Sequence, residues 1–501
     1  MEGPTTTNTS SQTSARRIAR NFTVRTVGEL VAKAASLVFF VDVARELGET
    51  GFGDFTLALS LTGTLILASG LGTDGLTARE VARDRSRIHS YLSNVVAVKG
   101  LTSALLLLVT FAIGTIEYSG DTRTAIYLVG AGVAIENVGR TWYALFQAYE
   151  RMEFVSLSLS VQRIITAAAA VTALELGYGL VAVSLIYLAG SGLGLLVAVW
   201  SMRRFVVVPR LELDRSRFVP LLRAGLPIGV ATLLFTILIR FDAVLLSFLK
   251  GGNNRQVGIY GAAFRLVEAT MFISWSFGTA ALPWLARHGG EAGDAQLVRG
   301  YELGLKVITA VLMPMGLVFA VLADDIIDLL YGHQYESSAV PLQLLGALTV
   351  LYGINYFTAT ALTAHDRPGL FSRLFIVVIA VNVVSNLILI PPYGATGAAA
   401  SAALSGVLLA ALGLRQSARA IGTIRVTRAF AGPIAGGAAM TVVLWLARGN
   451  LAAAVVLGGA TYVAGLAAFE RLAFPEDFAF FLTIVRRPRL GAPTPPPASV
   501  D

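Results

Sequence analysis

The chain has 501 residues, of which 55% are hydrophobic and only 14% are charged, and its formal net charge is +8. Ordinary soluble domains carry about 25% charged residues, so this composition does not suit a protein dissolved in water. Cysteine is absent and the four histidines show no HExxH spacing, so we predict no disulfide framework, catalytic residue, metal or cofactor. The basic residues lie in short stretches between apolar segments, so we expect no nucleic-acid partner.

The chain begins with a Ser/Thr-rich stretch, 1–20, which we predict to be a disordered cytoplasmic tail. Apolar stretches of about 20 residues follow without a gap long enough for a soluble domain, and such stretches cross a bilayer as α-helices. We therefore predict an all-α integral membrane protein with about fourteen transmembrane helices. The expected spans are roughly 23–43, 55–71, 95–116, 125–146, 154–176, 181–200, 224–248, 257–285, 301–322, 340–364, 370–390, 396–414, 429–446 and 451–469. The end, 471–501, is rich in proline and is predicted to be a second cytoplasmic tail.

Arginine alternates between the connections of these spans. It gathers before the first span, at 79–87, at 203–217, at 415–428 and again at 486–489, whereas the opposite connections carry acidic residues such as those at 324–328. Connections rich in arginine and lysine stay in the cytoplasm. We therefore predict a multi-pass protein of the cell (plasma) membrane with both termini inside.

A weak internal repeat divides the predicted helices. The segment 53–61, which opens the second span, resembles the segment 258–266, which opens the eighth. An offset of six spans preserves orientation, so the halves would be parallel repeats about an axis along the membrane normal. Small residues also recur by chance in membrane helices, but the shared spacing favours a repeat. We predict an N-lobe over 21–206, a C-lobe over 207–414 and two added helices over 415–470.

Several predicted spans contain charged residues, which cost about 2.5 to 3.5 kcal/mol each at the centre of a bilayer. Arg25, Glu29 and Lys33 are spaced by four in the first span, which places them on one helical stripe. Glu29 can pair with Arg25, and Lys99 and Arg163 have no opposite charge three or four residues away, so we expect Lys33, Lys99 and Arg163 to be unpaired. Unpaired cations in a membrane favour an anionic substrate, and the planar guanidinium of arginine suits phosphate.

For neighbours on one face, such as Glu136 and Arg140, an ion pair inside the bundle and a wet central cavity are equal alternatives. The candidate substrate-binding residues are Arg25, Lys33, Lys99, Arg163, Arg240, Arg265, Asn382 and Asn386. The candidates for ion pairs or for coupling are Glu29, Glu136, Arg140, Asp242 and Glu268.

Short motifs follow one another in a fixed order along the chain. They are 44–48 with 51–55, Arg240-Phe241-Asp242 with Val257-Gly258-Ile259-Tyr260, Tyr331-Gly332 with Tyr335, and 382–387 leading into 390–399. With these motifs and this number of spans, the chain resembles the lipid-linked oligosaccharide flippases of the polysaccharide transporter family. That family belongs to the multidrug/oligosaccharidyl-lipid/polysaccharide exporter superfamily, and the resemblance covers nearly the whole chain.

The resemblance implies two lobes of six helices around a cavity that opens alternately inward and outward, with two helices outside this core. It implies that the chain moves a polyprenyl-(pyro)phosphate-linked oligosaccharide from the inner to the outer leaflet, for surface polysaccharide or glycan biosynthesis. The implied partners are membrane lipids, the polyprenyl-linked oligosaccharide and enzymes of glycan biosynthesis. We expect Lys33, Arg163 and Arg265 to bind the head group. Coupling to an ion or to the membrane potential stays open.

Two other functions are alternatives. A cation-coupled multidrug exporter would have about twelve spans and a more acidic, aromatic cavity. A membrane glycan polymerase or glycosyltransferase would need catalytic carboxylates or histidine on a substantial external loop. The longest outer connection, 324–338, is too short for a catalytic domain. We therefore expect a transporter and not an enzyme.

Overall fold

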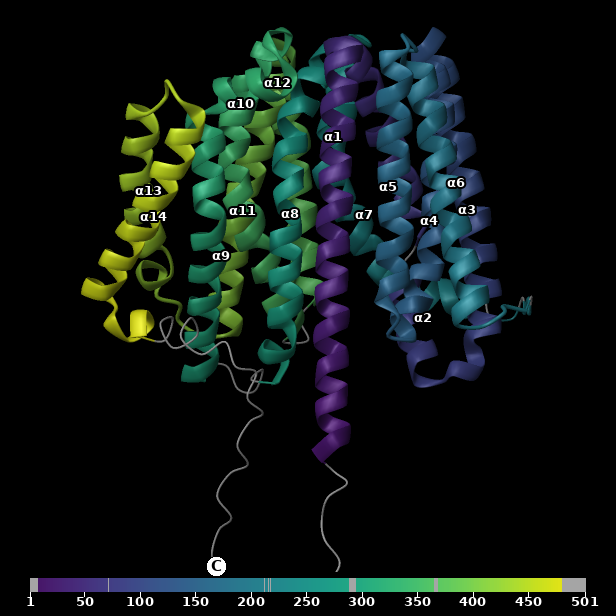
Figure 1. Cartoon of the computed structure of the whole chain (residues 1–501), viewed down its shortest axis with the longest axis horizontal. Helices are drawn as coiled ribbons and strands as arrows, with labels where there is room; N and C mark the ends of the chain where they lie inside the picture. Colours follow the sequence, from purple (N-terminus) through teal and green to yellow (C-terminus); the bar gives the residue numbers. More distant parts are fainter. Residues whose placement is uncertain are drawn as a thin grey trace, which may run out of the picture.

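The structure is a computed structural model that describes residues 8–70, 72–210, 212–214, 216, 218–287, 294–364 and 368–479. Within these ranges it is built from helices and contains no strand. Figure 1 shows long helices that run side by side in one elongated bundle. The predicted all-α fold is confirmed.

The first half of the chain forms one group of helices. Its members are α1 (Asn8–Ala68), α2 (Thr73–Arg83), α3 (Ile88–Glu117), α4 (Gly120–Ala148), α5 (Met152–Glu175) and α6 (Leu180–Phe205). Figure 1 places α2 to α6 on the right and α1 at the centre of the molecule. The helix α4 packs against α1, α3 and α6, and α5 packs against α1 and α6.

The second half forms a second group of helices. Its members are α7 (Phe218–Leu249), α8 (Arg255–Arg287), α9 (Ala295–Val321), α10 (Ala323–Tyr331), α11 (Ala339–Ala364), α12 (Pro368–Ala420), α13 (Val426–Leu446) and α14 (Leu451–Ala473). Of these, α8 to α14 lie to the left of α1 in Figure 1 and α7 lies to its right. The helix α11 packs against α8, α9 and α12, and α7 packs against α12. The pair α13 and α14 lies along α9 at the left end of Figure 1.

Two of these helices are bent at a glycine. Gly48 has a φ of 65° within α1 and Gly394 has a φ of 54° within α12, a backbone conformation that glycine adopts without the steric cost of a Cβ. The bend at Gly394 is also supported from α8, because the side-chain oxygen of Gln256 accepts a hydrogen bond from Ala395 N at 2.9 Å. Each bend lies between two predicted spans, so one bent helix replaces two spans and their connection.

The number of membrane crossings differs from the number of helices. Within the described ranges, nine helices are long and apolar enough to cross a membrane. The bent α12 is one of the nine, although it contains both of the predicted spans 370–390 and 396–414. The number of crossings therefore depends on the number of helices and also on whether the bent helices α1 and α12 each cross the membrane once or twice.

The two ends of the described chain lie on one side of the bundle. In Figure 1 α1 begins and α14 ends at the bottom, where the arginine-rich α2 also lies, whereas α10 lies at the top. The helix α1 begins at Asn8, inside the predicted tail 1–20, and residues 1–7 lie outside the described ranges. Of the predicted tail 471–501, residues 471–473 complete α14, and 480–501 lie outside the described ranges.

The two groups of helices meet where α1 crosses α8. A Cβ added to Gly53 would lie 1.8 Å from the backbone oxygen of Asn254, and one added to Gly258 would lie 1.9 Å from the backbone oxygen of Glu49. The contact is reciprocal: Gly53 and Gly258, the first residues of the two similar segments, each pack on the residue four positions before the other. Such self-complementary contacts are what a two-fold relation between two parts produces.

Salt bridges hold the end of α14, and the residues that follow it, against α9. Lys306 of α9 is almost fully buried, and its Nζ lies 2.7 Å from a carboxylate oxygen of Glu470 and 2.7 Å from one of Asp477. Arg299 and Arg428 also pair with Asp477. Because a buried lysine is costly without a carboxylate partner, these contacts hold the end of α14 against α9.

Candidate substrate site between the lobes

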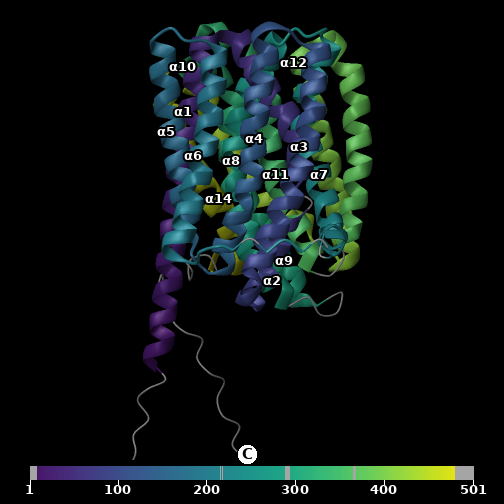
Figure 2. The ribbon, with the colours of Figure 1, turned by 90° about the vertical axis from the view of Figure 1, so that its right-hand side faces the viewer.

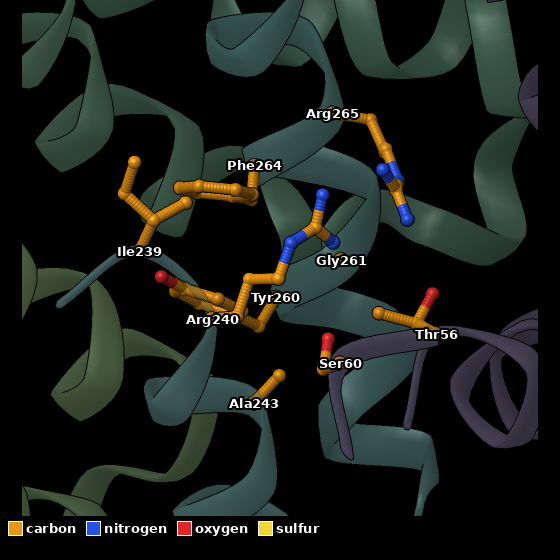
Figure 3. A pocket seen from close by; sticks show the side chains of 9 residues that line it. All are labelled: Thr56, Ser60, Ile239, Arg240, Ala243, Tyr260, Gly261, Phe264 and Arg265. Atoms are coloured by element: carbon orange, nitrogen blue, oxygen red, sulfur yellow. The ribbon is translucent and has the colours of Figure 1, made fainter. Parts of the chain in front are cut away.

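A small pocket lies where α1, α7 and α8 meet, between the two groups of helices that form the predicted lobes. It is lined by Thr56, Ser60, Ile239, Arg240, Ala243, Tyr260, Gly261, Phe264 and Arg265. Figure 3 shows the guanidinium groups of Arg240 and Arg265 pointing toward one another across this pocket. Two of the cations predicted to bind substrate are therefore brought together from different helices.

One carboxylate holds both arginines. Arg240 Nη2 lies 3.1 Å from Glu268 Oε1, and Arg265 Nη1 lies 2.5 Å from Glu268 Oε2. Arg265 and Glu268 are three residues apart on α8, a spacing that places them on the same helical face. Two guanidinium groups and one carboxylate leave this cluster with one net positive charge.

Residues of α1 also contact the two arginines. The ring of Phe40 lies 3.9 Å from the guanidinium carbon of Arg265, which is a close cation–π contact. A Cβ added to Gly63 would lie 3.4 Å from Cδ of Arg240, so the bare backbone of α1 leaves room for this side chain. The hydroxyl of Thr56 is buried in the pocket lining and has no hydrogen-bond partner among the described residues. This hydroxyl is therefore available to form a hydrogen bond with a ligand.

Two other predicted cations have partners that the sequence did not indicate. Lys99 is fully buried, and its Nζ lies 2.5 Å from Asp74 Oδ1 and donates to Asn137 O at 3.1 Å. Arg163 Nη2 lies 3.6 Å from Glu136 Oε1. The expectation that these two cations are unpaired is wrong, because it considered opposite charges on the same helix only. Their role in binding substrate stays a prediction.

Glu136 is held by polar groups from two further helices. Its Oε1 accepts hydrogen bonds from Gln162 at 2.7 Å and from Ser191 at 3.2 Å, whereas Arg140 on its own helix is exposed. Nothing in the local spacing of the sequence marks Gln162 or Ser191 as its partners. This cluster therefore joins α4, α5 and α6 inside the first group of helices.

The predicted stripe on α1 is described in part. Lys33 is exposed on α1, whereas the side chains of Arg25 and Glu29 lie outside the described residues. The structure therefore does not place the full stripe, and its part in the site stays a prediction.

The two predicted asparagines lie beside a buried carboxylate. Asp242 is 1% exposed; its Oδ1 accepts from Asn386 Nδ2 at 2.7 Å and its Oδ2 accepts from the Tyr260 hydroxyl at 3.2 Å. Asn386 also donates to Asn382 at 3.2 Å, and its own Oδ1 has no partner among the described residues. These oxygens can hold a proton or a small cation. Among the described residues, no group of three or more histidines and carboxylates could hold a metal ion.

Contacts on the side of α10 close one end of the interface. Arg45 Nε and Nη2 donate to the backbone oxygens of Leu330 and Leu329 at 2.6 and 2.5 Å, which satisfies carbonyl groups at the end of α10. Gln334 donates to the backbone oxygen of Arg45 at 2.9 Å, and Tyr335 donates to that of Ala44 at 2.9 Å. Two of the short motifs in the sequence, 44–48 and 331–335, therefore meet here.

Charged groups from α1 and α8 extend this closure. Arg255 forms a salt bridge with Glu49, and Asn254 Nδ2 donates to Asp54 Oδ1 at 2.6 Å. Figure 2, which views the molecule from the side of α3 to α6, shows α10 and the bend of α12 at the same end of the bundle. We call these contacts of Arg45, Glu49, Asp54 and their partners the end closure.

The fold is shared with transporters of known structure. Lipid II flippase MurJ, in an inward closed conformation, matches with a TM-score of 0.73 at 14% sequence identity, covering 89% of this chain and 98% of that chain. An inward-facing multidrug resistance MATE family transporter of the MOP superfamily matches with a TM-score of 0.65 at 16% identity, covering 78% and 94%. The chain therefore has the fold of this superfamily of multi-pass transporters.

The comparison of sequences identifies the family to which the chain belongs. The model of the family described as polysaccharide biosynthesis protein matches residues 18–288, more than half of the chain. The probable flippase AglR of Haloferax volcanii is 26% identical over 448 residues, which cover 87% of this chain and 89% of that protein. The chain belongs to the polysaccharide biosynthesis protein family. It is a multi-pass transporter of the plasma membrane and not an enzyme, and the predicted resemblance is confirmed.

Proposed function

We propose that this transporter is a flippase that moves a polyprenyl-(pyro)phosphate-linked oligosaccharide from the inner to the outer leaflet, for surface polysaccharide or glycan biosynthesis. The observation that carries the proposal is the pocket where Arg240 and Arg265 converge beside the hydroxyl of Thr56, which has no hydrogen-bond partner in the described part of the chain. Paired guanidinium groups suit the oxygens of a phosphate group. The names of the comparison proteins, a probable flippase and a lipid II flippase, agree with this substrate class.

We propose that the chain crosses the membrane fourteen times with both ends in the cytoplasm. This number results if α1 and α12 each cross twice about their bends, if α2 and α10 stay at the surface, and if every other helix crosses once. An even number agrees with α1 beginning and α14 ending on one side. The arginines of α2 then face the cytoplasm, as basic connections do.

Transport would follow from a change in the end closure. With the sidedness proposed above, this closure faces outward and the structure is shut toward the outer leaflet. A head group bound between the lobes leaves outward once α1 separates from α8 and α10, while the cytoplasmic side closes. The lipid tail stays in the bilayer during this step, so only the charged head needs a path through the protein.

A multidrug exporter of the same fold is the second candidate, and the pocket favours the flippase. Cationic drugs would need free carboxylates in the lining, but the described residues that line the pocket include two arginines and no acidic residue, and the carboxylate of Glu268 beside them is already paired with both arginines. The driving force is proposed to act through Asp242, whose buried carboxylate has no cationic partner among the described residues that contact it. A proton or a small cation would neutralise it.

The proposal is tested by translocation in proteoliposomes that contain a fluorescent polyprenyl-pyrophosphate-linked saccharide, measured by quenching of the label on one side. We expect Arg240→Ala/Arg265→Ala to slow translocation at least about a hundredfold, since the double variant loses two hydrogen bonds to charged groups, each of which contributes about 1.5 to 3 kcal/mol. Arg203→Ala/Arg204→Ala removes the same charge from an exposed site at the end of α6 and should leave the rate unchanged. An unchanged rate in the first variant would overturn the proposed site.

A further inference from the structure

Glu268 occupies its two arginines in the way that a phosphate group would. Each of its carboxylate oxygens takes one guanidinium, Oε1 that of Arg240 and Oε2 that of Arg265. A phosphate group presents two oxygens to two guanidinium groups in the same manner. The cluster is only partly exposed, with the side chain of Glu268 at 22% and that of Arg265 at 10% of full exposure. The attraction between these charges is therefore stronger than on an open surface.

Glu268 supplies the negative charge that the pocket lining lacks. The lining contains polar groups such as Thr56 and Ser60 but no acidic side chain. Without the carboxylate, Arg240 and Arg265 would face one another at short range with no anion between them, and like charges at this distance repel. Glu268 therefore keeps the empty pocket compact.

We propose that Glu268 is an internal substitute for the substrate phosphate: it holds Arg240 and Arg265 in the empty transporter, releases them to the incoming head group, and takes them back when the head group leaves. This inference rests on the proposed function, because it assumes that an anionic head group binds at these arginines. It assigns Glu268 a positioning role, acting on the substrate through the two arginines.

The exchange has a physical consequence for affinity and for release. A pyrophosphate that arrives while Glu268 is charged must compete with it for both arginines, so the carboxylate lowers the affinity. The same competition helps the head group to leave. A neutral side chain of equal size would therefore bind substrate more tightly and release it more slowly.

The exchange would also change contacts with α1, which belongs to the other lobe. Arg265 lies on the ring of Phe40, and Arg240 lies against Gly63, and both of these residues belong to α1. An arginine that turns from Glu268 to a phosphate changes its position against α1. The occupancy of the pocket and the packing between α1 and α8 are therefore linked.

The test measures binding of geranylgeranyl pyrophosphate, a sugar-free polyprenyl pyrophosphate, to the full-length protein in nanodiscs, with uncharged geranylgeraniol as the control probe. We expect Glu268→Gln to bind the pyrophosphate about tenfold more tightly than the natural protein, or about 1.4 kcal/mol. Glu268→Gln should also translocate labelled lipid more slowly over many turnovers. Glu268→Asp, whose shorter carboxylate reaches the arginines less well, should bind with intermediate affinity.

The matched control is Glu80→Gln. The carboxylate of Glu80 is likewise shared by arginines, with Arg79 at 3.2 Å and Arg83 at 3.7 Å, but it belongs to α2 and lies outside the pocket. This variant should bind and translocate like the natural protein. Thermal unfolding gives a second measurement. Without ligand, the Glu268→Gln protein should melt at a lower temperature than the natural protein. Addition of the pyrophosphate should raise its melting temperature by more than it raises that of the natural protein.

The outcomes separate this inference from the proposed function. If the natural protein binds the pyrophosphate in preference to the alcohol but Glu268→Gln binds it equally or less tightly, the role of Glu268 is overturned and the flippase proposal stands. If the natural protein and both Glu268 variants fail to distinguish the pyrophosphate from the alcohol, the anionic site itself is overturned, and the inference falls with it.

Discussion

Some charged residues in this transporter are held by partners from other helices. Lys99 of α3 is 0% exposed and meets Asp74 of α2, which is more than one third exposed. A buried ammonium group is tolerated because this carboxylate and the backbone oxygen of Asn137 surround it. The pair therefore fixes α2 against α3 and α4.

We predict that Asp74→Asn destabilises the protein by about 3 kcal/mol, because it leaves the buried charge of Lys99 without a counter-ion. This value is the low end of the usual range for a broken buried pair, because Asp74 itself is partly in contact with solvent. The measurement is unfolding of the purified protein in detergent, by heat or by denaturant.

The double variant Asp74→Asn/Lys99→Met serves as the control. It removes both charges and keeps an apolar side chain of similar length, so it should recover most of the lost stability. Equal stability of the natural protein and Asp74→Asn would show that Lys99 does not depend on Asp74.

At the scale of helices, bare glycine backbones let α1 and α8 approach each other at the end closure. Gly53 and Gly258 leave space that the backbone of the opposite helix fills. Neither helix can present a side chain at this point without moving away. The similar segments that open at these two glycines thus mark the tightest contact between the lobes.

We predict that Gly53→Ala opens the end closure, because its Cβ would lie 1.8 Å from the backbone oxygen of Asn254. The chain contains no cysteine, so Ser60→Cys in the pocket can report access from outside by its rate of labelling with an impermeant thiol reagent. Labelling should be several-fold faster in Gly53→Ala than in the protein with the reporter alone.

Gly100→Ala in α3 is the matched control for this prediction. No atom lies within 4 Å of a Cβ added there, and alanine in a helix is more favourable than glycine, so labelling should not change. If Gly53→Ala and Gly100→Ala label at the same rate, the glycine contact does not hold the lobes together.

At the scale of the whole molecule, the two lobes are joined most closely at one end. The end closure combines hydrogen bonds of Arg45 and Asn254 with the salt bridge between Glu49 and Arg255. The transport step proposed above requires these contacts to part in each cycle. Fixing the lobes at this point would therefore stop transport and leave the helices themselves intact.

We predict that Glu49→Cys/Arg255→Cys, bridged by a short cleavable bifunctional thiol reagent, loses lipid translocation and regains it when the bridge is cleaved. Each single cysteine variant treated with the same reagent should keep the activity that it has without the reagent. Full translocation by the bridged protein would contradict the separation of the lobes at this end.

The sequence by itself determined the class of the protein, the order of its helices and its family. Hydrophobic length is a property of one contiguous segment, so spans such as 95–116 and 181–200 lie inside α3 and α6 as predicted. The pairing of Arg265 with Glu268 was also readable, since residues three apart on a helix are neighbours. The bends in α1 and α12 could not be predicted, because a glycine between two predicted spans is as typical of a loop as of a kink in a continuous helix.

Only the tertiary structure decided which charges meet between helices. Asp74 and Lys99 are 25 residues apart, and Arg45 and Leu330 are 285 apart, so no local spacing predicts either contact. The same holds for Arg240, which reaches Glu268 from the neighbouring helix 28 residues away. The apolar length of a helix and the cations within it are properties of single segments, whereas the pocket depends on how α1, α7 and α8 pack, because packing brings two arginines to one carboxylate.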